Sequence, residues 1–198
     1  MNNSPKSFDK IFNKKTNGKM VRYGVIYGNN QIVFIKSGAF GTLEGKNNKR
    51  FKMATLIHNK MGATVICSTN PDAVQTNLDK LVITKTANEL NLNEFNLYLI
   101  GTSDSGYTNL DLAKEIPQTV KILGINPSFN TIENLEEKIK ALPQIKKIFV
   151  YGTNDTEYKH LKTFKKWQNH NLDVFTVPNA NHNFEGMDNT YISLFNLL

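Results

Sequence analysis

A serine flanked by small residues, Gly101-Thr102-Ser103-Asp104-Ser105-Gly106, follows the apolar residues 95–100 and precedes a helix-like segment. A tight turn from strand to helix lifts a serine hydroxyl above the edge of a sheet, and it needs small residues two positions before and after the serine. Gly101 and Ser105 meet that requirement. The pattern predicts Ser103 as a nucleophile, although Gly and Ser clusters are also ordinary loop composition.

A carboxylate and a histidine follow two later strand-like segments. Residues 145–151 run toward Asp155, and residues 172–177 lead into a polar loop that carries His182. Because the carboxyl ends of parallel strands share one crevice, these side chains can meet Ser103 there. His182 would take the serine proton, and Asp155 would hold the imidazole in the required tautomer. Taken alone, Asp155 could simply cap the next helix, and His182 could be solvated. Their common order and location favour catalysis.

These three segments resemble the α/β-hydrolase superfamily over residues 20–198. Residues 101–106 are similar to the G-x-S-x-G elbow of that family, residues 152–155 to its acid loop and residues 181–184 to its histidine loop. Ser105 stands where the family usually has glycine. The resemblance implies a Ser-His-Asp triad of Ser103, His182 and Asp155, with no metal and no organic cofactor.

The resemblance also implies an oxyanion hole built from backbone N–H groups. One donor would be Asp104, the residue after the nucleophile. The other would come from residues 37–41, a loop with the sequence Ser-Gly-Ala-Phe-Gly. We expect Ala39 to supply this second N–H, with Phe40 as the next candidate.

Alternating strand-like and helix-like segments predict an α/β fold, with a mostly parallel twisted sheet of about seven strands and helices on both faces. Asn29 and Asn30 tolerate positive φ and predict a hairpin between the first two strands. Strands are expected over residues 20–28, 31–36, 63–67, 95–100, 120–125, 145–151 and 172–177. Helices are expected over residues 49–61, 72–90, 106–116, 134–142, 156–168 and 186–198.

Residues 19–198 have the length of one domain. In the resembled family a lid is often inserted after the strand that follows the nucleophile helix. Here the run at residues 125–131 is short. We therefore expect a single α/β-hydrolase-like domain with no large lid and an open, shallow site.

The net charge of +7 is concentrated near the amino terminus. Residues 1–18 are rich in lysine and have little apolar periodicity, which predicts a flexible basic arm. Contact with an anionic surface or partner is the alternative role for this arm. No aromatic-basic platform or recognition helix is evident, so no specific nucleic-acid partner is expected.

The composition, 39% hydrophobic and 21% charged, is that of an ordinary globular domain. No segment reaches the length of about 18 apolar residues that a transmembrane helix needs, and residues 1–10 lack the apolar core of a secretory signal. The lone Cys67 lies in an apolar strand, where a buried and unreactive thiol is expected. These features predict a cytoplasmic protein.

Together, the candidate residues predict a serine hydrolase that cleaves a carboxylic ester or related acyl bond through an acyl-enzyme intermediate. Its substrate would be a small or acylated molecule, as for esterases, lipases and thioesterases. An acyltransferase with the same triad is the first alternative, because only the acceptor of the acyl group differs. A non-catalytic binding or scaffold protein with the same fold is the second, because fold does not determine function.

Overall fold

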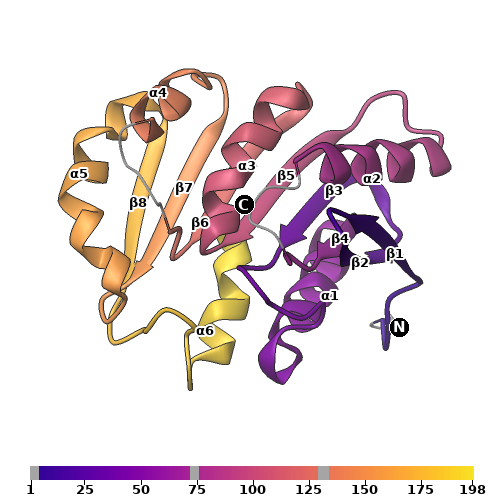
Figure 1. The fold of residues 1–198 in the computed structure, drawn as a ribbon, viewed down its shortest axis with the longest axis horizontal. Coiled ribbons are helices and arrows are strands. Elements are labelled where there is room, and N and C mark those ends of the chain that lie inside the picture. Colours follow the sequence, from indigo (N-terminus) through magenta and orange to yellow (C-terminus); the bar gives the residue numbers. More distant parts are fainter. Residues whose placement is uncertain (1–4, 72–75, 129–133) are drawn as a thin grey trace.

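The computed structural model describes residues 5–71, 76–128 and 134–198. Its centre is one twisted sheet with the strand order β1-β2-β4-β3-β5-β6-β7-β8 (Figure 1). The strands from β3 to β8 are parallel to one another, whereas β1 is antiparallel to β2 and β2 is antiparallel to β4. The strands are β1 (Lys10–Thr16), β2 (Lys19–Ile26), β3 (Asn29–Lys36), β4 (Ala63–Ser68), β5 (Asn96–Thr102), β6 (Thr119–Ile125), β7 (Lys146–Gly152) and β8 (Leu172–Val177).

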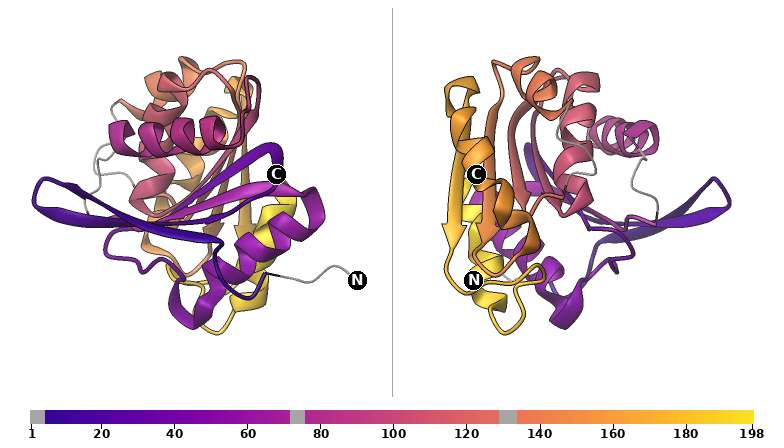
Figure 2. Two further views of the ribbon diagram at one scale, coloured as in Figure 1. Left: turned by 90° about the vertical axis from the view of Figure 1, so that its right-hand side faces the viewer. Right: turned by 60° about the vertical axis from the view of Figure 1, so that its left-hand side comes forward.

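Helices cover both faces of the sheet (Figure 2). α2 to α5 pack on one face and α1 and α6 on the other, so each face has its own apolar core. The predicted architecture, a mostly parallel sheet between two helical layers, is confirmed. The helices are α1 (Lys49–Met61), α2 (Thr76–Glu89), α3 (Asp104–Glu115), α4 (Leu135–Lys140), α5 (Leu161–Lys166) and α6 (Asp188–Ser193), with 3₁₀ turns at Lys46–Asn48, Thr156–His160, Gln168–His170 and Leu194–Leu197.

The central strands are apolar runs because both of their faces are covered. Every residue of β4 is buried. α1 packs on this strand through Met53, Ala54 and Ile57, which share one helical face. The helix ends as predicted at Gly62, whose φ of 64° suits a C-cap glycine. Cys67 of β4 is buried as expected, and burial raises the pKa of its thiol to about 12.

The amino-terminal strand corrects the prediction of a flexible arm over residues 1–18. Residues 10–16 form β1, which extends with β2 as a hairpin away from the helices (Figure 2). Asn17 and Gly18 make the two-residue turn, with φ of 48° and 76°. Asn-Gly favours this type of turn because both positions need positive φ. Phe12 stacks on Tyr23, with ring centroids 5.4 Å apart, and this contact anchors the strand.

The hairpin expected across Asn29 and Asn30 is wrong. β4 lies between β2 and β3, and β3 is parallel to both of its neighbours. The last five residues of β3 are buried, so this strand occupies a central position with both faces covered. The lysine-rich residues 10–16 occupy the edge instead, where charged side chains reach water.

Several predicted helices differ in extent, and the one expected over residues 186–198 is α6 followed by a 3₁₀ turn. Residues 156–168 form a 3₁₀ turn followed by α5 rather than one continuous helix. Of the helix expected over residues 72–90, the first four residues lie outside the described part of the chain, and α2 begins at Thr76. The chain passes from β6 to β7 through residues 126–145, and the described part of this stretch, residues 126–128 and 134–145, contains α4 and no large lid. None of the helices in the described part of the chain combines the length and the apolar composition that a membrane-spanning segment needs.

Candidate active site

Ser103 lies at the junction of β5 and α3 in a strained conformation. Its φ of 57° and ψ of −129° are rare for a residue that carries a side chain. The turn is tight, because a Cβ on Gly101 would lie 2.3 Å from the carbonyl oxygen of Ser105. The backbone N–H of Ser103 donates to the carbonyl of Ile125, 3.0 Å away on β6. These constraints hold the hydroxyl of Ser103 at the carboxyl edge of the sheet.

His182 bridges Ser103 and Asp155. Its Nε2 lies 3.1 Å from Oγ of Ser103, and its Nδ1 lies 2.7 Å from Oδ2 of Asp155. With the imidazole proton on Nδ1, His182 donates to the carboxylate and accepts from the serine hydroxyl. The three side chains come from loops after β5, β7 and β8. The structure therefore brings together Ser103, His182 and Asp155, in the order that the sequence predicts.

The carboxylate of Asp155 has two hydrogen-bond partners, one in the turn that follows it and one in the histidine loop. Its Oδ1 accepts the backbone N–H of Glu157 at 2.8 Å, which caps the following 3₁₀ turn. Its Oδ2 accepts from His182. The side chain of Asp155 is fully buried. Because the cap fixes one oxygen, the other is aimed at the imidazole.

The environment of His182 favours its cationic form. The hydrogen bond to Asp155 raises the pKa of His182 above its usual value, partial burial opposes this shift, and the charges of Asp155, Glu157 and Asp104 add to it. A raised pKa means a stronger base, which suits a group that accepts a proton from a hydroxyl.

The loop after β3 lies directly against Ser103. A Cβ on Gly38 would be 3.0 Å from Cβ of Ser103, so the glycine permits this approach. Ala39 lines the cleft beside Ser103 and His182. Asp104 is the first residue of α3, where a backbone N–H has no partner inside the helix.

The prediction that the backbone N–H of Phe40 could be an oxyanion donor needs correction. Its backbone N–H donates to the carbonyl of Asn70 at 3.1 Å, so this group is already engaged. Its side chain is 87% exposed. Phe40 has a positive φ of 59°, and it is absent from the lining of the cleft that Gly38, Ala39 and Gly41 share with Ser103. Of the two candidates in this loop, Ala39 alone remains.

The hydroxyl of Ser105 ties this loop to the elbow. It donates to the carbonyl of Ser37 and accepts from Nδ2 of Asn70 at 3.1 Å. All three residues are fully buried. Sequence reasoning treats Ser105 only as a small residue in place of glycine, whereas its hydroxyl connects the elbow to the loop that carries Ala39.

Asn126 is a second residue that sequence reasoning missed. It is fully buried and has a φ of 44° directly after β6. Its Oδ1 accepts from the N–H of Gly152 at 2.7 Å, and its Nδ2 donates to the carbonyls of Asn181 and His182 at 3.0 and 2.9 Å. One side chain thus joins the acid loop to the histidine loop. The available signal was its place at the carboxyl end of a strand, like the other site residues.

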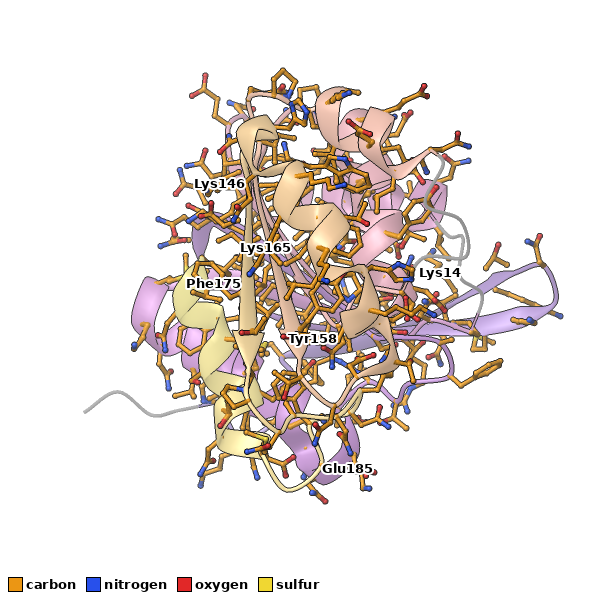
Figure 3. The ribbon with its side chains drawn as sticks, turned by 90° about the vertical axis from the view of Figure 1, so that its left-hand side faces the viewer. Lys14, Lys146, Tyr158, Lys165, Phe175 and Glu185 are labelled. Carbon is orange, nitrogen blue, oxygen red and sulfur yellow. The ribbon has the colours of Figure 1, made fainter. Side chains whose placement is uncertain are left out.

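A cleft of about 430 Å³ opens beside Ser103 and His182. Its walls include the loop after β3, the start of α1 and the loop before α6. The loop before α6 carries Glu185. In Figure 3, Glu185 is labelled beyond the carboxyl end of β8, the strand that contains Phe175. Another polar contact comes from Ser128, whose Oγ lies 3.2 Å from Oγ of Ser103. The cleft gives a small molecule access to the reactive hydroxyl.

No protein-family model matches the sequence, and no curated protein matches it. Solved structures match the fold over nearly the whole chain. A protein of unknown function from Agrobacterium tumefaciens, grouped with the α/β hydrolases, is 13% identical, with a TM-score of 0.70 over 94% of this chain and 93% of that one.

Two further structures are described as a serine hydrolase homologue and as a serine hydrolase. A homologue of α/β serine hydrolases from Coxiella burnetii is 14% identical, with a TM-score of 0.63 over 98% of this chain and 100% of that one. A lidless α/β serine hydrolase from Xanthomonas campestris is also 14% identical, with a TM-score of 0.59 over 96% of this chain and 92% of that one. At these identities the likeness concerns the fold. The chain has the α/β-hydrolase fold.

Proposed function

We propose that this protein is a serine hydrolase that cleaves a carboxylic ester or a related acyl bond through an acyl-enzyme intermediate. The observation that carries the proposal is the hydrogen-bonded series from Ser103 through His182 to Asp155, with contacts of 3.1 and 2.7 Å. Similar folds in proteins described as serine hydrolases support it.

In the first half of the reaction, Oγ of Ser103 attacks the acyl carbon while its proton passes to Nε2 of His182. Asp155 stabilises the imidazolium that forms and keeps the ring oriented. The bond from the acyl carbon to the leaving oxygen then breaks, and His182 returns the proton to the departing alcohol. Ser103 is left acylated.

The negative charge that develops on the carbonyl oxygen is stabilised by backbone N–H groups. Asp104 and Ala39 supply these donors in the proposal, and one such donor contributes about 3 kcal/mol to transition-state stabilisation. The dipole of α3, which begins at Asp104, acts in the same direction.

In the second half, water attacks the acyl carbon and gives a proton to His182. The bond to Oγ breaks, the carboxylic acid leaves and the proton returns to Ser103. The open cleft next to these residues admits the water that this step requires.

The direct test is turnover of a 4-nitrophenyl ester of a short fatty acid. We expect the wild-type protein to release nitrophenol, and Ser103→Ala and His182→Ala each to lose at least about a thousandfold in kcat. Ser193→Ala is the matched control, because this hydroxyl on α6 is exposed and donates to the carbonyl of Thr190. Equal activity of wild type and Ser103→Ala would contradict the proposal.

A further inference from the structure

One wall of the cleft beside Ser103 is cationic. It is formed by Lys46, Lys49 and Arg50, from the 3₁₀ turn before α1 and the first residues of that helix. Glu185 is the acidic residue in the same lining, and its carboxylate pairs with Lys46 at 3.1 Å. Glu185 therefore offsets the charge of Lys46, and the positive charges of Lys49 and Arg50 in this wall are not paired with it.

Arg50 is a buried cation that has no acidic partner in the part of the chain that the structure describes. It is 6% exposed, and no carboxylate in the described part of the chain lies within 4.0 Å of its guanidinium. Its Nη1 donates to the carbonyls of Thr42 and Leu43, while its Nε has no hydrogen-bond partner among residues 5–71, 76–128 and 134–198. A buried charge is costly unless it is paired. Because no nearby carboxylate of the described residues neutralises Arg50 and its side chain lines the cleft, its charge makes the electrostatic potential in the cleft more positive.

Lys49 places a second charge next to the reactive groups. Its Nζ donates to the carbonyl of Asn183, the residue after His182, and lies 4.5 Å from the ring centroid of Tyr191. Tyr191 in turn contacts Thr102, the residue before Ser103, with 2.9 Å between the two hydroxyl oxygens. The ammonium of Lys49 thus lies among the immediate neighbours of the nucleophile and the base.

The ammonium of Lys49 also has no direct counter-charge among the described residues. No acidic side chain of the described residues is within 4.0 Å of it, although Asp188 and Glu185 act on it from further away. Burial is the largest influence and lowers the pKa of Lys49. An ammonium has three N–H donors, and the contact with Asn183 uses one of them. An anionic group in the cleft would satisfy another and offset the desolvation.

We propose that the substrate of this protein carries a carboxylate, which Lys49 binds in the cleft while Arg50 supplies supporting positive potential. The inference rests on the proposed function and narrows it to esters or related acyl compounds of acidic molecules. The carboxylate could belong to the acyl part or to the alcohol part, so the test examines both.

For the acyl part, kcat/KM is compared for the monoester of glutaric acid with 4-nitrophenol and for 4-nitrophenyl pentanoate, which has the same chain length without the carboxylate. For the alcohol part, 4-acetoxybenzoate is compared with 4-methylphenyl acetate. We expect the wild-type protein to prefer the anionic member of at least one pair. Lys49→Met should lower that preference by about tenfold to a hundredfold, as expected for a hydrogen bond to a charged group.

Two variants separate specific binding from other effects. Lys52→Met removes the same charge from the exposed side of α1, and we expect it to leave the preference unchanged. Lys49→Arg keeps the charge and should retain part of the preference. A structural role of Lys49 in holding the histidine loop would lower the rates on both members of a pair equally, so the ratio reports binding of the anion.

The inference is overturned if wild type shows no preference in either pair, or if Lys49→Met leaves the ratio unchanged. If wild type hydrolyses none of the four esters, the proposed function fails separately. Calorimetric binding of monomethyl glutarate to Ser103→Ala then decides the inference. Binding that Lys49→Met abolishes in that background would support an anion site, and absence of binding would overturn it.

Discussion

Nδ2 of Asn126 lies 2.9 Å from the carbonyl oxygen of His182, and Oδ1 of the same side chain accepts from Gly152. This fully buried amide thus connects the loop of the base with the strand that leads to its carboxylate. Asn126→Asp keeps the shape but directs a carboxylate oxygen toward two carbonyls. We expect a loss of about 2–4 kcal/mol in the free energy of unfolding and a lower kcat, measured by urea denaturation and ester turnover.

Asn154→Asp is the matched control, because the side-chain amide of Asn154 is exposed and makes one long contact of 3.3 Å with Asn179. It should change stability by less than about 0.5 kcal/mol. Equal stability of the two variants would show that Asn126 does not connect the loops.

Removing the charge of Asp155 should cost far more activity than stability. In Asp155→Asn the amide still caps the turn at Glu157, but it no longer stabilises the imidazolium of His182 or favours the required tautomer. We expect kcat to fall by about 10³- to 10⁴-fold while the midpoint of thermal unfolding changes little. A fall of less than tenfold on the 4-nitrophenyl ester would contradict the role given to Asp155.

The acid limb of the pH profile should follow His182. A protonated imidazole cannot accept the proton of Ser103, so kcat/KM should fall as the pH drops through the pKa of His182. Because Asp155 raises this pKa above 6.5, the midpoint in wild type should lie above pH 6.5. In Asp155→Asn the midpoint should move to lower pH. A wild-type rate that stays constant from pH 8 to pH 5 would refute the assignment of the base.

The hydroxyl of Ser105 offers a test of the link between the elbow and the oxyanion loop. Ser105→Ala leaves the buried carbonyl of Ser37 without its donor, which costs about 1–3 kcal/mol of stability. We expect kcat to fall several-fold, because the loop with Ala39 loses an anchor. Ser105→Gly should lose activity as well. Higher activity in Ser105→Gly than in wild type would mean that the Cβ, and not the hydroxyl, determines the geometry of the turn.

A buried ion pair lies behind the site. Nζ of Lys36 is 2.6 Å from Oδ2 of Asp79, and the hydroxyl of Tyr23 donates to Oδ1 at 2.9 Å. Asp79→Ala leaves an unpaired ammonium in the core next to Ser37, so we expect a loss of about 3–5 kcal/mol. Tyr23→Phe removes one neutral donor and should cost about 1 kcal/mol. Chemical denaturation of both variants checks this order, which a larger loss in Tyr23→Phe would reverse.

The parallel part of the fold was predictable because apolar periodicity determines which residues are covered. Residues 49–61 and 172–177 form their predicted helix and strand without any change of bounds. The order of the amino-terminal strands was not predictable from Asn29 and Asn30. A local turn signal does not show that β4, which comes later in the chain, lies between β2 and β3. The Asn17-Gly18 dipeptide was the better signal, since both residues adopt positive φ in a two-residue turn.

Some residues of the candidate site could likewise be predicted from the sequence, and others could not. Ser103, Asp155 and His182 could be identified because each follows the carboxyl end of a strand, where parallel topology brings loops together. The roles of Asn126, Asn70 and the Ser105 hydroxyl could not be predicted, because they arise from contacts between segments far apart in sequence. The engagement of the Phe40 amide with Asn70 depends on such a contact too, and local sequence gives no sign of it.

Covalent labelling with a fluorophosphonate tests the central claim most directly, because the reagent reacts with a serine only when a base activates its hydroxyl. The intact mass of the wild-type protein should increase by one phosphonyl group, and peptide mapping should place the adduct on Ser103. Ser103→Ala should remain unlabelled, and His182→Ala should label far more slowly. A folded wild-type protein that takes up no reagent, or that is labelled on another residue, would contradict the account.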